Sequence, residues 1–121
     1  MNLAQVTLNR RTVLLVEDDF LIAMDVAASL EEDGARVVGP AATVSVALDL
    51  ISQTESLDAA ILDINLRGTT SYAIADVLRD RGVPIVFVTG YDKSIVPDHY
   101  ADVPICQKPF DLARCSALLF E

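Results

Sequence analysis

The pattern of hydrophobic positions along the chain predicts alternating strands and helices. Five short apolar runs are bounded by charged residues, glycine or proline. They lie at residues 12–16, 36–39, 58–63, 85–88 and 103–107. These runs are nearly continuous rather than alternating, which is typical of strands buried on both faces of a parallel sheet. We therefore predict five parallel strands, the second of which ends at Pro40.

The segments between these runs carry apolar residues at helical spacing. Helices are predicted at residues 20–34, 44–53, 71–82 and 111–119. Gly34 and Gly82 close two of them, and Ser71 or Thr70 can cap the third. Between residues 91 and 102 the helical spacing is lost around Pro97, three Asp residues and Ser94, so we expect a mostly irregular segment with a short or irregular fourth helix.

The alternation of strands and helices predicts an α/β fold. Right-handed crossovers between parallel strands leave helices on both faces of the sheet. The simplest arrangement is a flavodoxin-like, doubly wound, five-stranded parallel sheet, (βα)5, with the strand order 2-1-3-4-5. We expect one domain over residues 1–121, with its core at 12–120 and a lead-in at 1–11.

Polar residues stand at the ends of four of the predicted strands. Glu17 and Asp18 follow the first strand, and Asp63 ends the third. Thr89 follows the fourth strand and Lys108 the fifth. In the expected order the first and third strands are neighbours, and ligands bind in the crevice outside the carboxyl ends of such strands. We therefore expect these five side chains to converge on one crevice.

Three carboxylates in one crevice indicate a metal site. Glu17, Asp18 and Asp63 repel one another and raise one another's pKa values unless a cation relieves them. Hard oxygen ligands with room for water suit Mg²⁺. With the cation screening its charge, Asp63 can act as a nucleophile toward phosphorus and form an aspartyl phosphate. Lys108 then supplies a cation, and Thr89 a hydroxyl donor, for the phosphoryl oxygens.

Composition argues against several classes of function. The net charge of −9 and the pI near 4.3 disfavour direct binding to nucleic acid or to an anionic membrane. No apolar run approaches the length that a membrane-spanning helix needs. Cys106 and Cys115 fall in a strand-like run and a helical pattern, so we interpret them as small buried hydrophobic residues rather than a disulfide. We expect a cytoplasmic protein with no membrane insertion.

Four motifs together resemble those of response-regulator receiver domains, the CheY-like family. They are Val16-Glu17-Asp18-Asp19, Ile61-Leu62-Asp63-Ile64-Asn65-Leu66, Val88-Thr89-Gly90 and Lys108-Pro109-Phe110. The resemblance covers residues 12–119. It implies that Asp63 is the phosphoacceptor, that Asp18 binds Mg²⁺ directly and that Glu17 binds it through water. It also implies that Asn65 offers its backbone carbonyl to the metal. We interpret Asp19 as the cap of the first helix, the alternative being that it reaches the site.

The resemblance implies a response regulator of a two-component phosphorelay. A histidine kinase or a phosphotransfer protein would donate the phosphoryl group to Asp63, and Mg²⁺ would be required. Such a domain is a signalling phosphoacceptor that catalyses only its own phosphorylation and dephosphorylation. No DNA-binding or other effector segment follows the last predicted helix, so we expect output through contact with a downstream protein.

Two features depart from the usual pattern of the family. Most receivers carry Tyr or Phe three residues before the lysine of the fifth strand, whereas this chain has Ile105. Phe87-Val88-Thr89-Gly90-Tyr91 resembles the signature of the alphaproteobacterial FATGUY receivers, which are typically partnered by histidine kinases of the HWE or HisKA_2 type. Because Ile105 has no ring to rotate, we expect an order–disorder switch in residues 91–102, which should bury few apolar groups.

Two other functions stay open at this point. One is a Mg²⁺-dependent phosphohydrolase with an Asp nucleophile, although a haloacid-dehalogenase type would want a second acid where the chain has Asn65. The other is a pseudo-receiver that only binds partners. That hypothesis predicts a missing functional group, whereas all five residues of the expected crevice are present.

Overall fold

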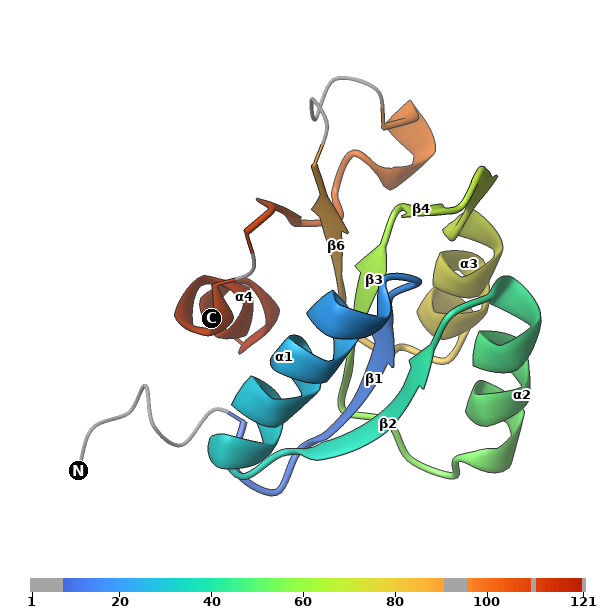
Figure 1. Ribbon diagram of the computed structural model, residues 1–121. Coiled ribbons are helices and arrows are strands. Elements are labelled where there is room, and N and C mark those ends of the chain that lie inside the picture. The colour runs from blue at the N-terminus through green and yellow to red at the C-terminus, as the bar shows by residue number, and fades with distance from the viewer. Residues whose placement is uncertain (1–7, 91–95, 110, 121) are drawn as a thin grey trace.

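A computed structural model describes residues 8–90, 96–109 and 111–120, which form a parallel sheet with helices on both faces (Figure 1). The sheet contains β1 (Thr12–Val16), β2 (Arg36–Ala41), β3 (Ala59–Asp63), β6 (Ile85–Thr89) and β7 (Ile105–Gln107). The helices are α1 (Phe20–Glu32), α2 (Val44–Gln53), α3 (Tyr72–Asp80) and α4 (Leu112–Phe120), with a 3-10 helix, η3, at Asp98–Tyr100. Within the described residues, no helix is long and apolar enough to cross a membrane.

The strand order confirms the predicted fold class. All neighbouring strands of the sheet are parallel, in the order β2-β1-β3-β6-β7. This is the predicted order 2-1-3-4-5, because β4 (Asn65–Leu66) and β5 (Thr69–Thr70) form a separate antiparallel hairpin. Every residue of β3 and β6 is buried, as expected for central strands that are covered on both faces.

Alternate residues of each strand face opposite layers of helices. Val13 and Leu15 of β1 pack in the cluster that includes residues of α1 and α4. Leu14 and Val16 pack in the cluster that includes residues of α2 and α3, on the other face (Figure 1). Leu8 is also buried in the first cluster, at 1% exposure, so the packed structure begins before the predicted core boundary at residue 12.

Side-chain caps begin two of the helices. The carboxylate of Asp19 accepts a hydrogen bond from the Ile22 N–H at 3.1 Å, so the predicted cap of the first helix is confirmed. The hydroxyl of Thr43 caps α2 in the same way. Ser71 occupies the N-cap position of α3, but its buried hydroxyl has no hydrogen-bond partner among the described residues. Of the two residues predicted to cap this helix, Ser71 therefore occupies the cap position, but without the side-chain hydrogen bond that a cap usually makes.

The second strand is longer than the sequence pattern predicted. β2 continues through Pro40 to Ala41, so the prediction that Pro40 ends it is wrong. Two features explain the difference. β2 is an edge strand, where a residue without an N–H donor is tolerated, and its register with β1 shifts between Leu14 and Val16. Beyond the shift, the N–H of Glu17 donates to the carbonyl of Ala41 at 2.9 Å, so the pairing of β1 with β2 continues as far as Glu17, the first acid after β1.

The described part of the connection between β6 and β7, residues 96–104, is irregular, as predicted, but it includes a well-packed residue. Within residues 96–104 the helical structure is the single turn of η3, and residues 91–95 lie outside the described residues. Tyr100 of this turn is only 6% exposed, so the expectation that the segment buries few apolar groups is wrong for this residue. Its ring stacks on Tyr72 at 4.7 Å and meets Phe87 edge-on at 5.9 Å.

Polar contacts complete the attachment of this segment to α3. The hydroxyl of Tyr100 donates to the Asp76 carboxylate at 2.8 Å. Arg79 donates to the carbonyl of His99 and to the carboxylate of Asp102, both at 3.2 Å. Burial of Tyr100, together with the neighbouring Asp76 charge, raises the pKa of its hydroxyl to about 12. The phenol therefore stays protonated and remains a donor at physiological pH.

The two cysteines lie together in the core, as small buried hydrophobic residues. Cys106 of β7 and Cys115 of α4 are 1% and 0% exposed, and both are free thiols. Their sulfur atoms lie 3.3 Å apart, and burial raises the pKa of Cys115 well above its usual range. The prediction of two buried residues without a disulfide is confirmed.

We predict that the hydroxyl of Tyr100 stabilises the fold through Asp76. Tyr100→Phe should lower the free energy of unfolding by about 1 kcal/mol, the usual value of one such hydrogen bond. Tyr100→Ala should lower it by about 3 kcal/mol or more, because the ring is also lost. Urea unfolding followed by circular dichroism measures both. Tyr72→Phe is the matched control, since it removes a hydroxyl from the ring stacked on Tyr100 and leaves the bond from Tyr100 to Asp76 in place; equal effects of the two Phe variants would contradict the prediction.

Candidate functional site

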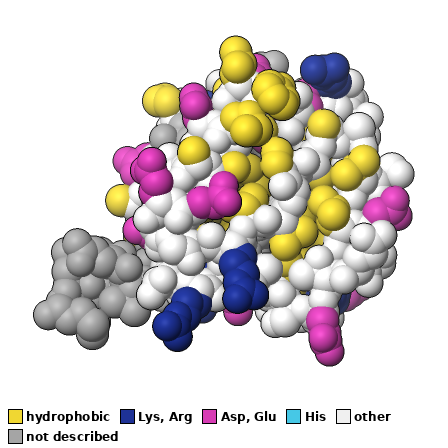
Figure 2. Space-filling view, turned by 60° about the horizontal axis from the view of Figure 1, so that its bottom comes forward, with side chains coloured by type: hydrophobic (Ala, Val, Ile, Leu, Met, Phe, Trp, Pro, Cys, Tyr) yellow, Lys and Arg dark blue, Asp and Glu magenta, His cyan; other side chains and the backbone are white. Residues whose placement is uncertain are grey.

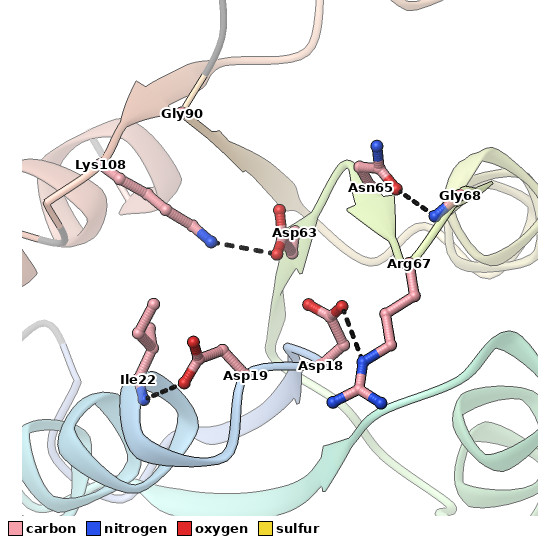
Figure 3. A pocket seen from close by; sticks show the side chains of 9 residues that line it. All are labelled: Asp18, Asp19, Ile22, Asp63, Asn65, Arg67, Gly68, Gly90 and Lys108. Atoms are coloured by element: carbon pink, nitrogen blue, oxygen red, sulfur yellow. Dashed lines mark hydrogen bonds and ion pairs between the residues drawn. The ribbon is translucent and has the colours of Figure 1, made fainter.

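A cavity of about 600 Å³ opens at the carboxyl edge of the sheet (Figure 3). Four residues that the sequence predicted for the site line it, namely Asp18, Asp63, Asn65 and Lys108. Glu17 lies beside them, buried at 6% exposure. Thr89 ends β6 at the same edge of the sheet, at 2% exposure. The strand ends therefore meet in the way that the predicted strand order required.

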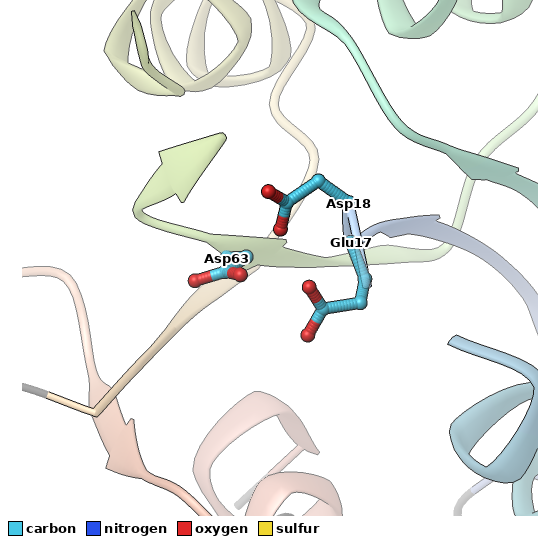
Figure 4. A group of neighbouring side chains, drawn as sticks. All are labelled: Glu17, Asp18 and Asp63. Atoms are coloured by element: carbon cyan, nitrogen blue, oxygen red, sulfur yellow. The ribbon is translucent and has the colours of Figure 1, made fainter. Parts of the chain in front are cut away.

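The pairing of β1 with β3 brings the three acids together. Val16 is the partner of Leu62 in the ladder, so the residues that follow them, Glu17 and Asp63, are neighbours. One carboxylate oxygen from each of Glu17, Asp18 and Asp63 lies within 4.8 Å of the other two. Figure 4 shows Asp18 and Glu17 directed toward the side on which Asp63 lies. This spacing and this set of hard oxygen atoms fit one divalent cation such as Mg²⁺.

Lys108 joins two of these acids. Its ammonium group lies 3.0 Å from Oε1 of Glu17 and 3.1 Å from Oδ2 of Asp63. The backbone fixes the start of this side chain, because the N–H of Lys108 donates to the carbonyl of Thr89 at 2.8 Å. Burial alone would lower the pKa of Lys108, but its bonds to Glu17 and Asp63 outweigh burial and raise it. Lys108 is therefore a fixed cation at the floor of the cavity.

The two buried acids have pKa values displaced in opposite directions. Burial, together with the hydrogen bond and the charge of Glu17, raises the pKa of Asp63 to about 7, against the opposing effect of Lys108. Burial also acts to raise the pKa of Glu17, but hydrogen bonds, first that of the Asp19 N–H at 3.0 Å, lower it overall. Glu17 has this additional donor, so Asp63 is the acid that holds the proton near neutral pH.

A tight hairpin turn forms the opposite wall of the cavity. The side-chain oxygen of Asn65 accepts a hydrogen bond from the Gly68 N–H at 2.7 Å, which closes the turn between β4 and β5 (Figure 3). Arg67 in this turn has a φ of 54° and Gly68 a φ of 91°. The side chain of Asn65 is thus used to shape the turn, and its backbone carbonyl as a metal ligand stays a prediction.

Arg67 is a site residue that the sequence interpretation missed. Its Nε lies 3.5 Å from Oδ2 of Asp18 across the cavity (Figure 3). The signal that was available is its position in a turn only four residues after Asp63, at the same edge of the sheet. Asp19 also lines the cavity, but its carboxylate caps α1, and the group of described acids that can share one cation consists of Glu17, Asp18 and Asp63.

We predict a pH-dependent contribution of Asp63 to stability. Its pKa is about 7 in the fold and about 4 in the unfolded chain, so the folded state binds more protons between these values. The protonated carboxyl therefore contributes stability that is fully present below about pH 4 and is lost as pH rises to about 7. Asp63→Asn keeps a neutral side chain, so in EDTA it should be more stable than the wild type at pH 8, by roughly 4 kcal/mol, the equivalent of a difference of about three between the two pKa values.

Urea unfolding at pH 5, 6, 7 and 8 measures this contribution as the difference between Asp63→Asn and the wild type. Asp49→Asn, on α2 and outside the site, is the control and should leave the pH profile unchanged. A constant difference between Asp63→Asn and wild type across this range would show that Asp63 does not take up a proton.

Proteins related to this chain are known from sequence and from structure. The phyllosphere-induced regulator PhyR from Methylorubrum extorquens is 32% identical over 110 residues, which cover 88% of this chain and 41% of PhyR. The transcriptional regulatory protein PdtaR from Mycobacterium tuberculosis is 30% identical over 107 residues, which cover 85% of this chain and 52% of PdtaR. The chain thus spans about half or less of the length of these curated relatives.

A solved structure matches over nearly the whole length of both chains. The solution structure of SdrG from Sphingomonas melonis Fr1 has a TM-score of 0.79 and 39% identity, and the match covers 91% of this chain and 96% of that chain. The family model of the response regulator receiver domain matches residues 13–117, a stretch that contains all of the sheet except Thr12 and all predicted site residues. The protein belongs to the family of CheY-like response regulator receiver domains.

Proposed function

We propose that this chain is the phosphoacceptor of a two-component phosphorelay, in which a histidine kinase or a phosphotransfer protein phosphorylates Asp63 in a Mg²⁺-dependent reaction. One observation carries the proposal. Asp63 ends the central strand with a carboxylate oxygen within 4.8 Å of oxygen atoms of Glu17 and Asp18, and with Lys108 bonded to it at 3.1 Å. A nucleophile, a cation site and a fixed positive charge thus share one cavity.

The expected metal ligands are Asp18 and Asp63, with Glu17 through water and Asn65 through its backbone carbonyl. When bound, Mg²⁺ would screen the negative charge of these acids and of the incoming phosphoryl group. The carboxylate oxygen of Asp63 attacks phosphorus, and the bond from phosphorus to the donor nitrogen breaks with its electron pair going to the histidine. Lys108 and the Thr89 hydroxyl donate hydrogen bonds to the phosphoryl oxygens.

The surface supports output through protein contacts. Phe20, Leu21 and Met24 on α1 are 72%, 74% and 48% exposed, although large apolar side chains on a helix are usually buried. They directly follow Asp19, which lines the cavity. Figure 2 shows one face of the molecule on which hydrophobic side chains gather, with separate acidic side chains and a few basic ones around them. A protein partner with apolar and basic residues fits such a surface better than nucleic acid does.

The kinase type and the compartment are parts of the same proposal. The Phe87-Val88-Thr89-Gly90-Tyr91 motif supports a kinase of the HWE or HisKA_2 type. Both thiols are free and buried in the core, which fits a protein of the reducing cytoplasm.

We predict that Asp63 takes up the phosphoryl group and needs Mg²⁺ to do so. Acetyl phosphate with Mg²⁺ should add one phosphoryl group to the wild-type protein, seen by intact-mass spectrometry. Asp63→Asn or EDTA should reduce labelling to background, because the nucleophile or the screening cation is removed. Turnover of acetyl phosphate without an adduct would favour a phosphohydrolase, and neither adduct nor turnover would favour a pseudo-receiver. Labelling of Asp63→Asn at the wild-type level would refute the proposal.

We predict separate roles for the two donors to the phosphoryl oxygens. Lys108→Ala and Thr89→Ala should each slow phosphorylation by roughly 100-fold, the usual effect of removing one donor from a developing negative charge. Both variants should still bind Mg²⁺, because neither residue is an expected ligand. Isothermal titration with MgCl₂ and the labelling rate measure the two effects. Ser52→Ala, which removes a hydroxyl from α2 away from the cavity, is the control; loss of Mg²⁺ binding in Lys108→Ala or Thr89→Ala would show that their roles are misassigned.

A further inference from the structure

Arg67 places a second positive charge at the cavity, and the phosphoacceptor chemistry does not use it. Its Nε lies 3.5 Å from Oδ2 of Asp18, the acid expected to bind Mg²⁺ directly. In Figure 3 its side chain extends from the β4–β5 hairpin toward Asp18, on the side of the cavity opposite Lys108. The inference drawn from this contact rests on the proposed function, because it concerns the same metal site.

The hairpin directs Arg67 to this position. Leu66 is buried at 5% exposure and holds the turn against the core, while Asn65 and Gly68 close it through their hydrogen bond of 2.7 Å. Arg67 adopts a left-handed backbone conformation, with φ 54°, which is uncommon for a residue other than glycine. The turn is thus built so that the residue at this position projects over the carboxylate of Asp18.

The two cations of the site differ in how firmly they are held. Lys108 bonds two buried carboxylates, and 27% of its side chain is exposed. Arg67 bonds one carboxylate, and 81% of its side chain is exposed. Only 17% of the Asp18 side chain is exposed, so this acid favours a cation beside it, but the guanidinium is already largely in water and can leave Asp18 at low cost to itself. A divalent cation bound to Asp18 would repel a guanidinium at this distance.

We propose that Arg67 is a competing counter-ion, which Mg²⁺ must displace from Asp18, so that Arg67 sets the Mg²⁺ concentration at which the site fills. A neutral residue at position 67 removes both the competing ion pair and the repulsion between two cations. The affinity for Mg²⁺ therefore rises when Arg67 loses its charge. The residue acts through Asp18 and does not touch the phosphoryl group.

Metal binding itself, rather than phosphorylation, tests this inference. Titration of ¹⁵N-labelled protein with MgCl₂ gives the Kd from the amide signals of Asp18 and Asn65. Arg67→Gln, of similar length but neutral, should lower this Kd about two- to fivefold, the range expected for an exposed ion pair. Arg67→Lys keeps the charge and should remain near the wild type. Arg36→Gln is the control of equal charge change, because Arg36 is exposed at the opposite end of the sheet.

A second signal reports the displacement directly. The Nε–Hε resonance of Arg67 in the wild type should shift on addition of MgCl₂ and saturate with the same Kd as the amide of Asp18. An equal or weaker Mg²⁺ affinity in Arg67→Gln, or a decrease in Kd as large in Arg36→Gln, would overturn the inference while leaving the proposed function intact. Failure of the wild type to bind Mg²⁺ would overturn the proposed function itself.

Discussion

The structure depends on one electrostatic constraint, the burial of two carboxylates at neighbouring strand ends. Glu17 and Asp63 are only 6% and 7% exposed. Burying one charged carboxylate costs several kcal/mol unless partners compensate it. Three partners do so here: the ammonium of Lys108, the Asp19 N–H that bonds Glu17, and the proton that Asp63 retains up to a pH of about 7. The fold can hold these acids because its own groups offset their charge.

This compensation links parts of the sheet that do not pair with one another. Lys108 follows β7, an edge strand of three residues whose partner in the sheet is β6. Glu17 and Asp63 follow β1 and β3, nearer the centre of the sheet. The two contacts of Lys108 therefore connect an edge of the sheet to its middle across the cavity. Any change in the charge of Asp63 acts directly on Lys108, the residue after β7, and so on the segment that leads into α4.

The sequence was sufficient for the parts of the fold that follow from periodicity. Buried parallel strands have continuous apolar runs, and strand order then brings their ends to one edge, so the meeting of Glu17, Asp63 and Lys108 could be predicted from the sequence. Tyr100 was not expected to be buried, because its partners Tyr72 and Asp76 lie 28 and 24 residues away. The continuation of β2 through Pro40 likewise depends on a register shift in β1, which no local pattern reveals.

The contact of Arg67 with Asp18 could not be predicted from residue type alone. An arginine in a polar turn after a strand is ordinarily interpreted as a solvated residue, and at 81% exposure it is indeed solvated. Its contact with Asp18, which lies 49 positions earlier in the chain, depends on the geometry of the hairpin. That geometry is set by Asn65, Gly68 and the buried Leu66.

Lys108 and Arg67, the two cations of the cavity, differ in exposure, and this difference gives them different roles in the proposed function. Lys108 is held by two buried acids and by its backbone bond to Thr89, so removing it would leave Glu17 and Asp63 uncompensated. Arg67 can be exchanged for another cation because its own side chain is 81% exposed, while the Asp18 side chain, 17% exposed, keeps a cation beside it in either case. In the proposed function, a phosphoryl group arriving at Asp63 would meet the fixed charge of Lys108, whereas Arg67 would leave Asp18 when Mg²⁺ binds there.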